Sequence, residues 1–301
     1  MSTGRGRVAS VVFVNREPFR AATPTGDLVG WVTGEGPPVL ALHGGPGLSF
    51  GYLDPVVDEV AAGFRVATFQ QRGLAPSTTS GPFTVDQAVA DVVAVLDHLG
   101  WQRAFVLGHS WGGHLGFHVA HDIGPRLLGV LAVEPLGGVG DGGKALFDDE
   151  MLARLPDDVR SVAQALDDRD AAGEATDAEA LESLRLFWPA YYAEPVHAPA
   201  MPPMATNRVT SRDLWLDLFD RLPQLEKSLA EITVPVGVVV GSRSPMPPKE
   251  AGIATARRIP GAWWVTVPDG GHFTWVEAPG CVLDAMRRLA AGSAAPPPDR
   301  P

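Results

Sequence analysis

The sequence predicts an α/β fold with a mostly parallel central sheet, and three observations support this. Short apolar runs typical of buried strands alternate with segments of helical periodicity along most of the chain. One such run, Ala104–Leu107, passes directly into Gly108-His-Ser-Trp-Gly112 and a helix-forming segment. Another, Val39–His43, leads into the glycine-rich loop 44–47. Strands that alternate with helices pack as parallel strands joined by right-handed crossovers.

The predicted elements follow from composition and periodicity. Phe19–Ala22 and Asp27–Thr33 flank a Pro-Thr-Gly turn and form the expected hairpin. The other expected strands are Val39–His43, Phe64–Phe69, Ala104–Leu107, Leu127–Val133, Val234–Val240 and Ala262–Val267. The expected helices are Val85–Leu99, Gly112–His121, Lys249–Arg258 and Val276–Leu289.

The alternation breaks between about Gly137 and Leu229, a segment rich in helix-forming residues. An insertion of this length between two core strands predicts a helical cap over the active site. We therefore expect residues 1–136 and 230–292 to form the core, 137–229 the cap and 293–301 a disordered tail.

The cap sequence carries aromatic residues suited to an apolar pocket. Trp188, Tyr191 and Tyr192 cluster just before a stretch rich in proline and methionine, Glu194–Met204. Such side chains can line a substrate pocket, although each taken singly could equally belong to the core of the cap.

Composition narrows the class of partner. The net charge of −11 disfavours nucleic acid and anionic membrane surfaces, and the single cysteine precludes an intramolecular disulfide. No apolar stretch reaches the length of a membrane span, and the amino terminus does not read as a signal peptide. We expect a cytoplasmic protein that acts on a small-molecule or short peptide-like, partly apolar substrate; the oligomeric state stays open.

The strand–turn–helix around Ser110 predicts a reactive serine. Gly108, Ser110 and Gly112 form the Gly-x-Ser-x-Gly pattern of a nucleophile elbow, in which a strained turn projects the serine hydroxyl. The small residues let the chain approach itself closely. The helix that follows directs unpaired amides at an oxyanion formed on Ser110.

With these elements in place, the chain resembles the α/β-hydrolase superfamily, and within it the proline iminopeptidase-like branch. The resemblance rests on His43-Gly-Gly-Pro-Gly47, Gln71-Arg-Gly73, Gly108–Gly112 and Gly271-His272. It implies an α/β-hydrolase fold with the cap after strand 6, Ser110 as nucleophile and His272 as general base. It also implies an oxyanion hole made by the backbone amides of Gly45 and Trp111.

The acid of the triad departs from the family pattern. The family usually carries Asp after strand 7, where this chain has Ser244. Glu134 follows strand 6 directly and keeps the order nucleophile, acid, base, so we expect it to orient His272. Ser244→Ala is then expected to have almost no effect on turnover. Asp269 is the next candidate, but it lies three residues before His272 and suits a turn.

Two further departures bear on the substrate. Proline iminopeptidases hold the free amine of the substrate with acidic cap residues, and Phe187–Glu194 matches that motif poorly. Gln70 also replaces the Asp that usually precedes Gln71-Arg-Gly73. His114, His118 and His121 share a helical face without a cysteine or carboxylate, so no metal and no cofactor is expected.

These features favour a serine hydrolase that cleaves a small ester, lactone or amide through an acyl-enzyme on Ser110. Three alternatives remain open: a non-hydrolytic enzyme of the same fold (acyl transfer, elimination or cyclisation in secondary metabolism), a proline iminopeptidase-type aminopeptidase, and a non-catalytic binding protein. An epoxide hydrolase or dehalogenase is disfavoured, because those enzymes of the superfamily use Asp at the elbow.

Overall fold

The computed structural model describes residues 15–292, so the predicted disordered tail lies outside the described part of the chain. Within it, eight strands form one sheet in the order β1-β2-β4-β3-β5-β6-β7-β8. Only the pairs β1–β2 and β2–β4 are antiparallel, and the pairs from β4 to β8 are all parallel. The predicted α/β class with a mostly parallel sheet is confirmed.

The strands agree with the predicted ranges to within a few residues. They are β1 Glu17–Thr23, β2 Gly26–Thr33, β3 Pro38–Leu42, β4 Arg65–Phe69, β5 Ala104–His109, β6 Leu127–Val133, β7 Val236–Gly241 and β8 Trp263–Val267. The helices of the sheet layers are α1 Asp54–Val60, α2 Val85–His98, α3 Trp111–Asp122, α8 Ala254–Arg258, α9 Thr274–Glu277 and α10 Cys281–Ala290.

Two helical predictions need correction, and one helix of the sheet layers was missed. The short helix α1 was not predicted. The predicted helix Lys249–Arg258 begins as one π-helical turn, Lys249–Ile253, before α8. The predicted helix Val276–Leu289 is two helices, because Pro279 and Gly280 interrupt it and Gly280 takes a φ of +93° that favours glycine.

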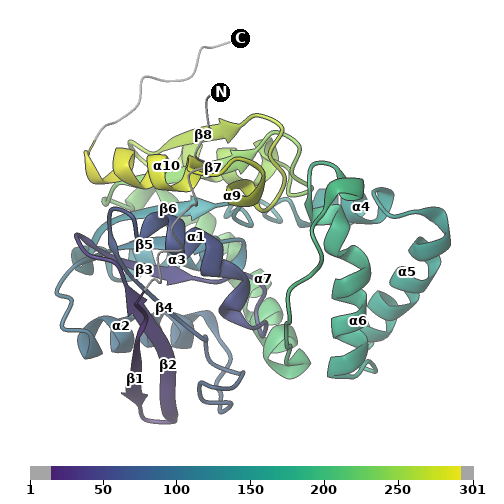
Figure 1. The fold of residues 1–301 in the computed structure, drawn as a ribbon, viewed down its shortest axis with the longest axis horizontal. Helices are drawn as coiled ribbons and strands as arrows, with labels where there is room; N and C mark the ends of the chain where they lie inside the picture. The colour runs from purple at the N-terminus through teal and green to yellow at the C-terminus, as the bar shows by residue number, and fades with distance from the viewer. Residues whose placement is uncertain (1–14, 293–301) are drawn as a thin grey trace, which may run out of the picture.

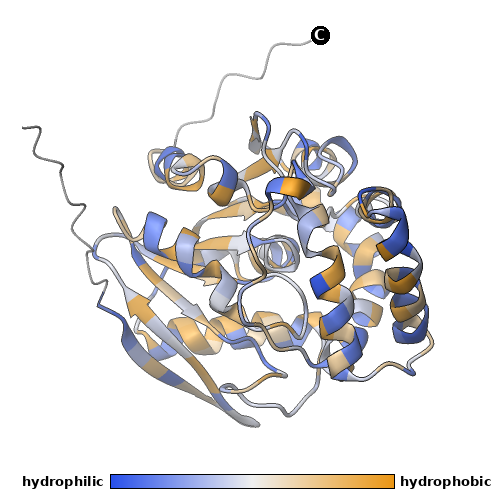
Figure 2. Cartoon of the chain, turned by 45° about the vertical axis from the view of Figure 1, so that its right-hand side comes forward, coloured by the Kyte–Doolittle hydropathy of each residue, from blue (hydrophilic) through white to orange (hydrophobic). Residues whose placement is uncertain are grey.

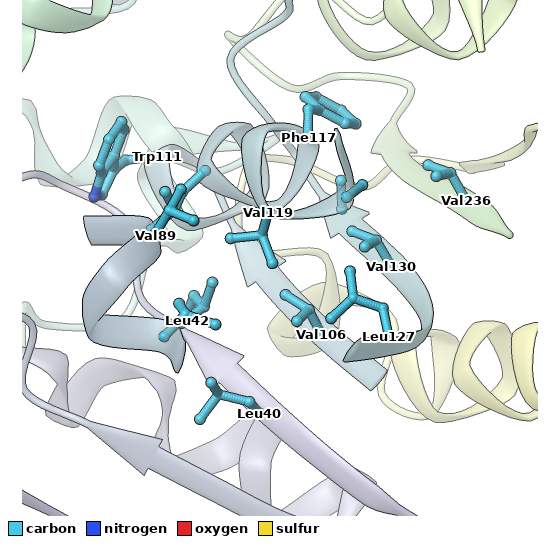
Figure 3. Close-up of a cluster of buried hydrophobic side chains, with 14 of the residues drawn as sticks. Leu40, Leu42, Val89, Val106, Trp111, Phe117, Val119, Leu127, Val130 and Val236 are labelled. Carbon is cyan, nitrogen blue, oxygen red and sulfur yellow. The ribbon is translucent and has the colours of Figure 1, made fainter. Parts of the chain in front are cut away.

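Helices cover both faces of the sheet, and alternate residues of each central strand face opposite layers. Leu40 and Leu42 of β3 pack under α2 and α3, whereas Val39 and Ala41 pack under α1 and α10. Figure 3 shows α3 over the strands, with Val119 directed toward Val106 and Val130 and with Phe117 on the opposite side of the helix. Each such fully buried side chain stabilises the fold by roughly 1.5–3 kcal/mol.

A helical insertion follows β6 and precedes β7. It contains α4 Lys144–Ala153, α5 Asp157–Ala171, α6 Asp177–Phe187, α7 Arg208–Ser228 and the short 3-10 helices Trp188–Tyr191 and Pro195–His197. Figure 1 shows α4, α5 and α6 grouped at one side of the molecule. These helices mix hydrophilic and hydrophobic residues, whereas the central strands are mainly hydrophobic (Figure 2).

The insertion has two parts with different packing. Helices α4 to α6 enclose a small core of their own, made by Met151, Leu155, Ala163, Phe187 and Ala190. Helix α7 instead returns to the main core through Leu214, Leu218, Leu222 and Leu225. The insertion is therefore anchored to the sheet layers by α7, while α4 to α6 stand beside them.

Candidate active site

The turn between β5 and α3 holds Ser110 in a strained conformation. Ser110 has φ +55° and ψ −118°, a region that residues with a side chain rarely occupy. The turn is possible because glycines flank it: a Cβ at Gly108 would lie 2.1 Å from the Gly112 carbonyl oxygen, and one at Gly112 would lie 2.2 Å from the Leu42 oxygen. This is the predicted nucleophile elbow geometry, with Ser110 at the end of a buried strand.

Two backbone amides at the predicted oxyanion hole have no partner. Among residues 15–292, neither the Gly45 nor the Trp111 N–H donates a hydrogen bond. Gly45 has φ +65°, which turns the loop after β3 next to the elbow, where a Cβ on Gly44 would lie 2.7 Å from the Ser110 Cβ. Both amides are therefore free to bind an oxyanion on the carbon that Ser110 attacks.

His272 lies in the loop after β8 and is 2% exposed. Its backbone N–H donates to the Tyr191 carbonyl at 2.8 Å, and its own carbonyl lies 3.0 Å from Nε2 of His109. Nδ1 of His109 in turn lies 2.8 Å from the Tyr52 hydroxyl, so both ring nitrogens of His109 have hydrogen-bond partners within the fold. Ser110 and His272 line the same cavity, without a hydrogen bond between their side chains among the described residues.

Glu134 directly follows β6, with φ +51° and no exposed surface. Its Oε2 lies 3.5 Å from Nδ1 of His272, and that nitrogen has no hydrogen-bond partner. The Gly241 N–H donates to Oε1, and the Ser244 hydroxyl donates to Oε2 at 2.5 Å. The structure thus brings Glu134 and His272 together, and it gives Ser244 a contact that the sequence did not reveal. Asp269 is exposed in a turn, with φ +51°.

Burial is the largest cause of the pKa shifts of His272 and Glu134. It lowers the pKa of His272 to about 3 and raises the pKa of Glu134 to about 8, because neither charged form is solvated there. Hydrogen bonds from Ser244 and Gly241 act in the opposite direction on the pKa of Glu134. His272 is therefore neutral at neutral pH, which is the form that can accept a proton.

The cavity that Ser110 lines has an empty volume of about 640 Å³, which includes open solvent at its mouth. Core elements contribute Gly44, Gly45, Leu48, Tyr52, His109, Ser110, Leu136, Met246, His272 and Phe273. The insertion contributes Lys144, Phe147, Leu184, Trp188, Tyr191, Met204 and Trp215. The lining is therefore mostly apolar and comes from both parts of the molecule.

Of the three aromatic residues that were predicted to line the pocket, two do so and one does not. Trp188 and Tyr191 line the cavity, but Tyr192 is 4% exposed and packs against Phe273, outside the lining. Tyr52, Lys144 and Trp215 were not foreseen. They come from three separate helices, so no local pattern could have placed them at one cavity.

The described part of the chain lacks two features: a cluster of side chains suited to a metal ion and a helix suited to crossing a membrane. No group of three or more His, Cys, Asp or Glu side chains in it is arranged to hold a metal ion. His121 is paired with Asp122, whereas His114 is buried with its Nδ1 3.2 Å from the Leu136 carbonyl oxygen. None of the helices in residues 15–292 combines the length and the apolar character that a membrane crossing requires.

Residues 37–279 match the model of the alpha/beta hydrolase fold family, and the chain belongs to that family. It is 28% identical over 260 residues to a protein of Caulobacter sp. (strain K31) named as a putative carbamate hydrolase, covering 85% of this chain and 91% of that protein. It is 34% identical over 110 residues to epoxide hydrolase B of Mycobacterium tuberculosis, covering 35% of this chain; the match spans only 31% of that relative.

Solved structures agree on the fold. The enol-lactonase from Burkholderia xenovorans LB400 matches with a TM-score of 0.64 and 21% identity, covering 90% of this chain and 99% of that one. The proline iminopeptidase of Mycobacterium smegmatis matches with a TM-score of 0.62 and 21% identity, covering 92% and 99%. At these identities the likeness establishes the α/β-hydrolase fold.

Proposed function

We propose that this protein is a serine hydrolase that cleaves a small, partly apolar ester, lactone or amide through an acyl-enzyme on Ser110. The observation that carries the proposal is the meeting of three features at one cavity. These are a strained serine at φ +55°, two unpaired amides beside it, and a buried neutral histidine whose Nδ1 faces a carboxylate. The named activities of the lactonase and carbamate hydrolase relatives are of the same chemical kind.

In the proposed reaction, His272 takes the hydroxyl proton of Ser110 as the oxygen attacks the substrate carbonyl. The negative charge that develops on the carbonyl oxygen is bound by the amides of Gly45 and Trp111. His272 then protonates the leaving group, and a water activated by the same imidazole releases the acyl group. Glu134 stabilises the imidazolium formed in each step and holds Nδ1 as the protonated nitrogen.

The lining of the cavity bears on the substrate. Within the described residues, no Asp or Glu lines it, whereas Lys144 brings a positive charge. A free ammonium group would find a like charge there and no carboxylate to bind it. The lining therefore favours a neutral or anionic ester, lactone or amide over the amino-terminal substrate of a proline iminopeptidase.

The residue at the elbow also separates two reaction types. Opening an epoxide through a covalent ester intermediate requires a carboxylate nucleophile, and Ser110 has none. We therefore do not transfer the activity named for the epoxide hydrolase relative to this chain.

The test needs no known substrate. The protein is incubated with a fluorophosphonate probe, its intact mass is measured, and Ser110→Ala serves as the control. One adduct that Ser110→Ala abolishes is the expected result, and a panel of esters, lactones and amides then ranks the substrates. An unmodified wild-type protein, with no turnover in the panel, would instead favour a binding protein of this fold.

A further inference from the structure

Ser244 occupies a buried position in the loop after β7 and has a directed hydroxyl. It is 7% exposed, and its Oγ accepts a hydrogen bond from the Met246 N–H at 3.2 Å. The same oxygen lies 2.5 Å from Oε2 of Glu134. Because the backbone donor fixes one side of the hydroxyl, its own proton is directed at the Glu134 carboxylate.

The Ser244 hydroxyl contacts the same carboxylate oxygen of Glu134 that lies near Nδ1 of His272. Oε2 of Glu134 receives the Ser244 hydroxyl and also lies 3.5 Å from Nδ1 of His272, while Oε1 is held by the Gly241 amide. Glu134 has no exposed surface, so no solvent replaces a donor that is lost. We propose that Ser244 is a positioning residue whose hydroxyl fixes the Glu134 carboxylate beside His272. The inference rests on the proposed function, because it presumes that Glu134 acts through His272.

Two consequences separate this role from a purely structural one. A hydrogen bond to a carboxylate favours its ionised form, so loss of the hydroxyl should raise the pKa of Glu134 further and move the pH dependence of Ser110 reactivity upward. In addition, a carboxylate introduced at position 244 would lie close to the present position of Oε2. It should therefore replace the missing charge when residue 134 is neutral.

The experiment measures the rate of fluorophosphonate labelling of Ser110 from pH 5 to pH 10. For Ser244→Ala we expect roughly tenfold slower labelling at pH 7 and a rising limb displaced upward by about one pH unit, the effect of losing one charge-assisted hydrogen bond. Ser244→Thr keeps the hydroxyl and should stay near the wild-type profile. Ser242→Ala is the matched control, because Ser242 is exposed in the same loop and its hydroxyl accepts from the Asp269 amide rather than contacting Glu134.

A double variant gives a second, independent readout. In Glu134→Gln the side-chain amide presents a donor to Nδ1, and labelling should be slow. When Glu134→Gln is combined with Ser244→Asp, the new amide can donate to the new carboxylate, and that carboxylate can accept from His272. We expect labelling at least tenfold faster than for Glu134→Gln alone, about the gain from restoring one charge-assisted hydrogen bond.

The outcomes are distinct. Wild-type labelling rates in Ser244→Ala, or slower labelling with an unmoved pH limb, would overturn the positioning role. If Ser244→Ala does not fold, as its melting curve would reveal, the double variant decides: a rate equal to that of Glu134→Gln alone overturns the role. A wild-type enzyme whose Ser110 is never labelled would overturn the proposed function itself, and the inference with it. A Glu134→Gln variant with full reactivity would overturn the role of Glu134, and therefore the inference, but not the nucleophile.

Discussion

The proposed reactive groups and the proposed substrate-facing groups of this protein come from two differently built regions. Gly45, Ser110, Glu134 and His272 follow β3, β5, β6 and β8, and strong local constraints hold them, such as the φ values of Ser110 and Glu134. The insertion contributes seven further residues of the cavity lining, through side chains on α4, α6, α7 and the segment between α6 and α7. The difference teaches that, in the hydrolase that we propose, backbone geometry holds the reactive groups, whereas side chains of the insertion set the selectivity.

The two regions are nevertheless joined beside His272, the proposed general base. The Tyr191 carbonyl of the insertion accepts the His272 N–H at 2.8 Å. Glu277 accepts from the Gly271 amide at 2.6 Å and from the Ala193 amide at 2.8 Å. A displacement of the 188–193 segment would therefore move the base as well as the wall of the pocket.

The largest effect should come from the nucleophile. Ser110→Ala removes the attacking atom, so turnover should fall on the order of 10⁵-fold, and His272→Ala and the double variant should fall about as far because the two act as a unit. Steady-state kinetics on the best ester of the panel measures this, with melting temperature as the control for folding. Turnover near the wild-type level in Ser110→Ala would disprove the nucleophile.

Glu134→Gln should give the next largest effect. The amide keeps the shape but can place a donor against Nδ1, which favours the wrong tautomer, so kcat should fall roughly 10²- to 10⁴-fold with little change in KM. In the wild type, the active form has Glu134 ionised, so kcat/KM should rise with pH and level off above the Glu134 pKa of about 8. A flat profile across neutral and mildly alkaline pH would contradict the role of this carboxylate.

The two regions also differ in what their sequence could predict. The elbow was predictable because glycines at 108 and 112 leave one local geometry, and Glu134 followed from strand order. Replacement of Ser244 was expected to have almost no effect on activity. The sequence shows that the usual Asp is missing, but it does not show that the Ser244 hydroxyl lies 2.5 Å from a carboxylate 110 residues away. The lining by Lys144, Phe147 and Trp215 depends on how α4 and α7 pack, a long-range property that hydrophobic periodicity does not encode.

Acid should destabilise the core region rather than the insertion. Burial lowers the pKa values of five histidines that all lie in the core: His43, His109, His114, His118 and His272. The unfolded chain binds protons below about pH 6.5 that the folded core excludes, so stability is full above that pH and is lost as pH falls toward 4. Each histidine contributes up to about 1.4 kcal/mol per pH unit over that window.

Urea unfolding at about pH 7 and about pH 5, on either side of the ordinary histidine pKa, measures this loss of stability. His118 has a buried Nε2 without a partner, so His118→Leu should reduce the dependence on pH. The exposed His197 of the insertion provides the control, and His197→Gln should leave the pH dependence of stability unchanged. An equal pH dependence in the wild type and His118→Leu would contradict the assignment to buried histidines.

Two aromatic residues of the pocket wall should separate selectivity from stability. Phe147 is half-buried at the cavity, so Phe147→Ala should shift the preferred acyl length by roughly tenfold in kcat/KM, about the value of one or two methylenes. Trp188 is 5% exposed and donates to the Pro199 carbonyl, so Trp188→Ala should also lower stability by about 3 kcal/mol. The ratio of kcat/KM across an acyl series, set beside the melting temperatures, checks both. A change in melting without any change in selectivity would make Phe147 part of the packing alone.

The smallest effect should come from the charge at the pocket mouth. Lys144 lines the cavity but is partly exposed and paired with Asp148 on the next turn of α4, so solvent and its partner weaken its field. Lys144→Met should improve kcat/KM for an amine-bearing ester relative to its neutral isostere by roughly threefold to fivefold, the scale of a screened surface charge. Asp148→Asn should act in the opposite direction, because it leaves the ammonium group unpaired. If the two variants shifted the ratio the same way, the discrimination would come from the shape of the wall, and the insertion would select its substrate by packing alone.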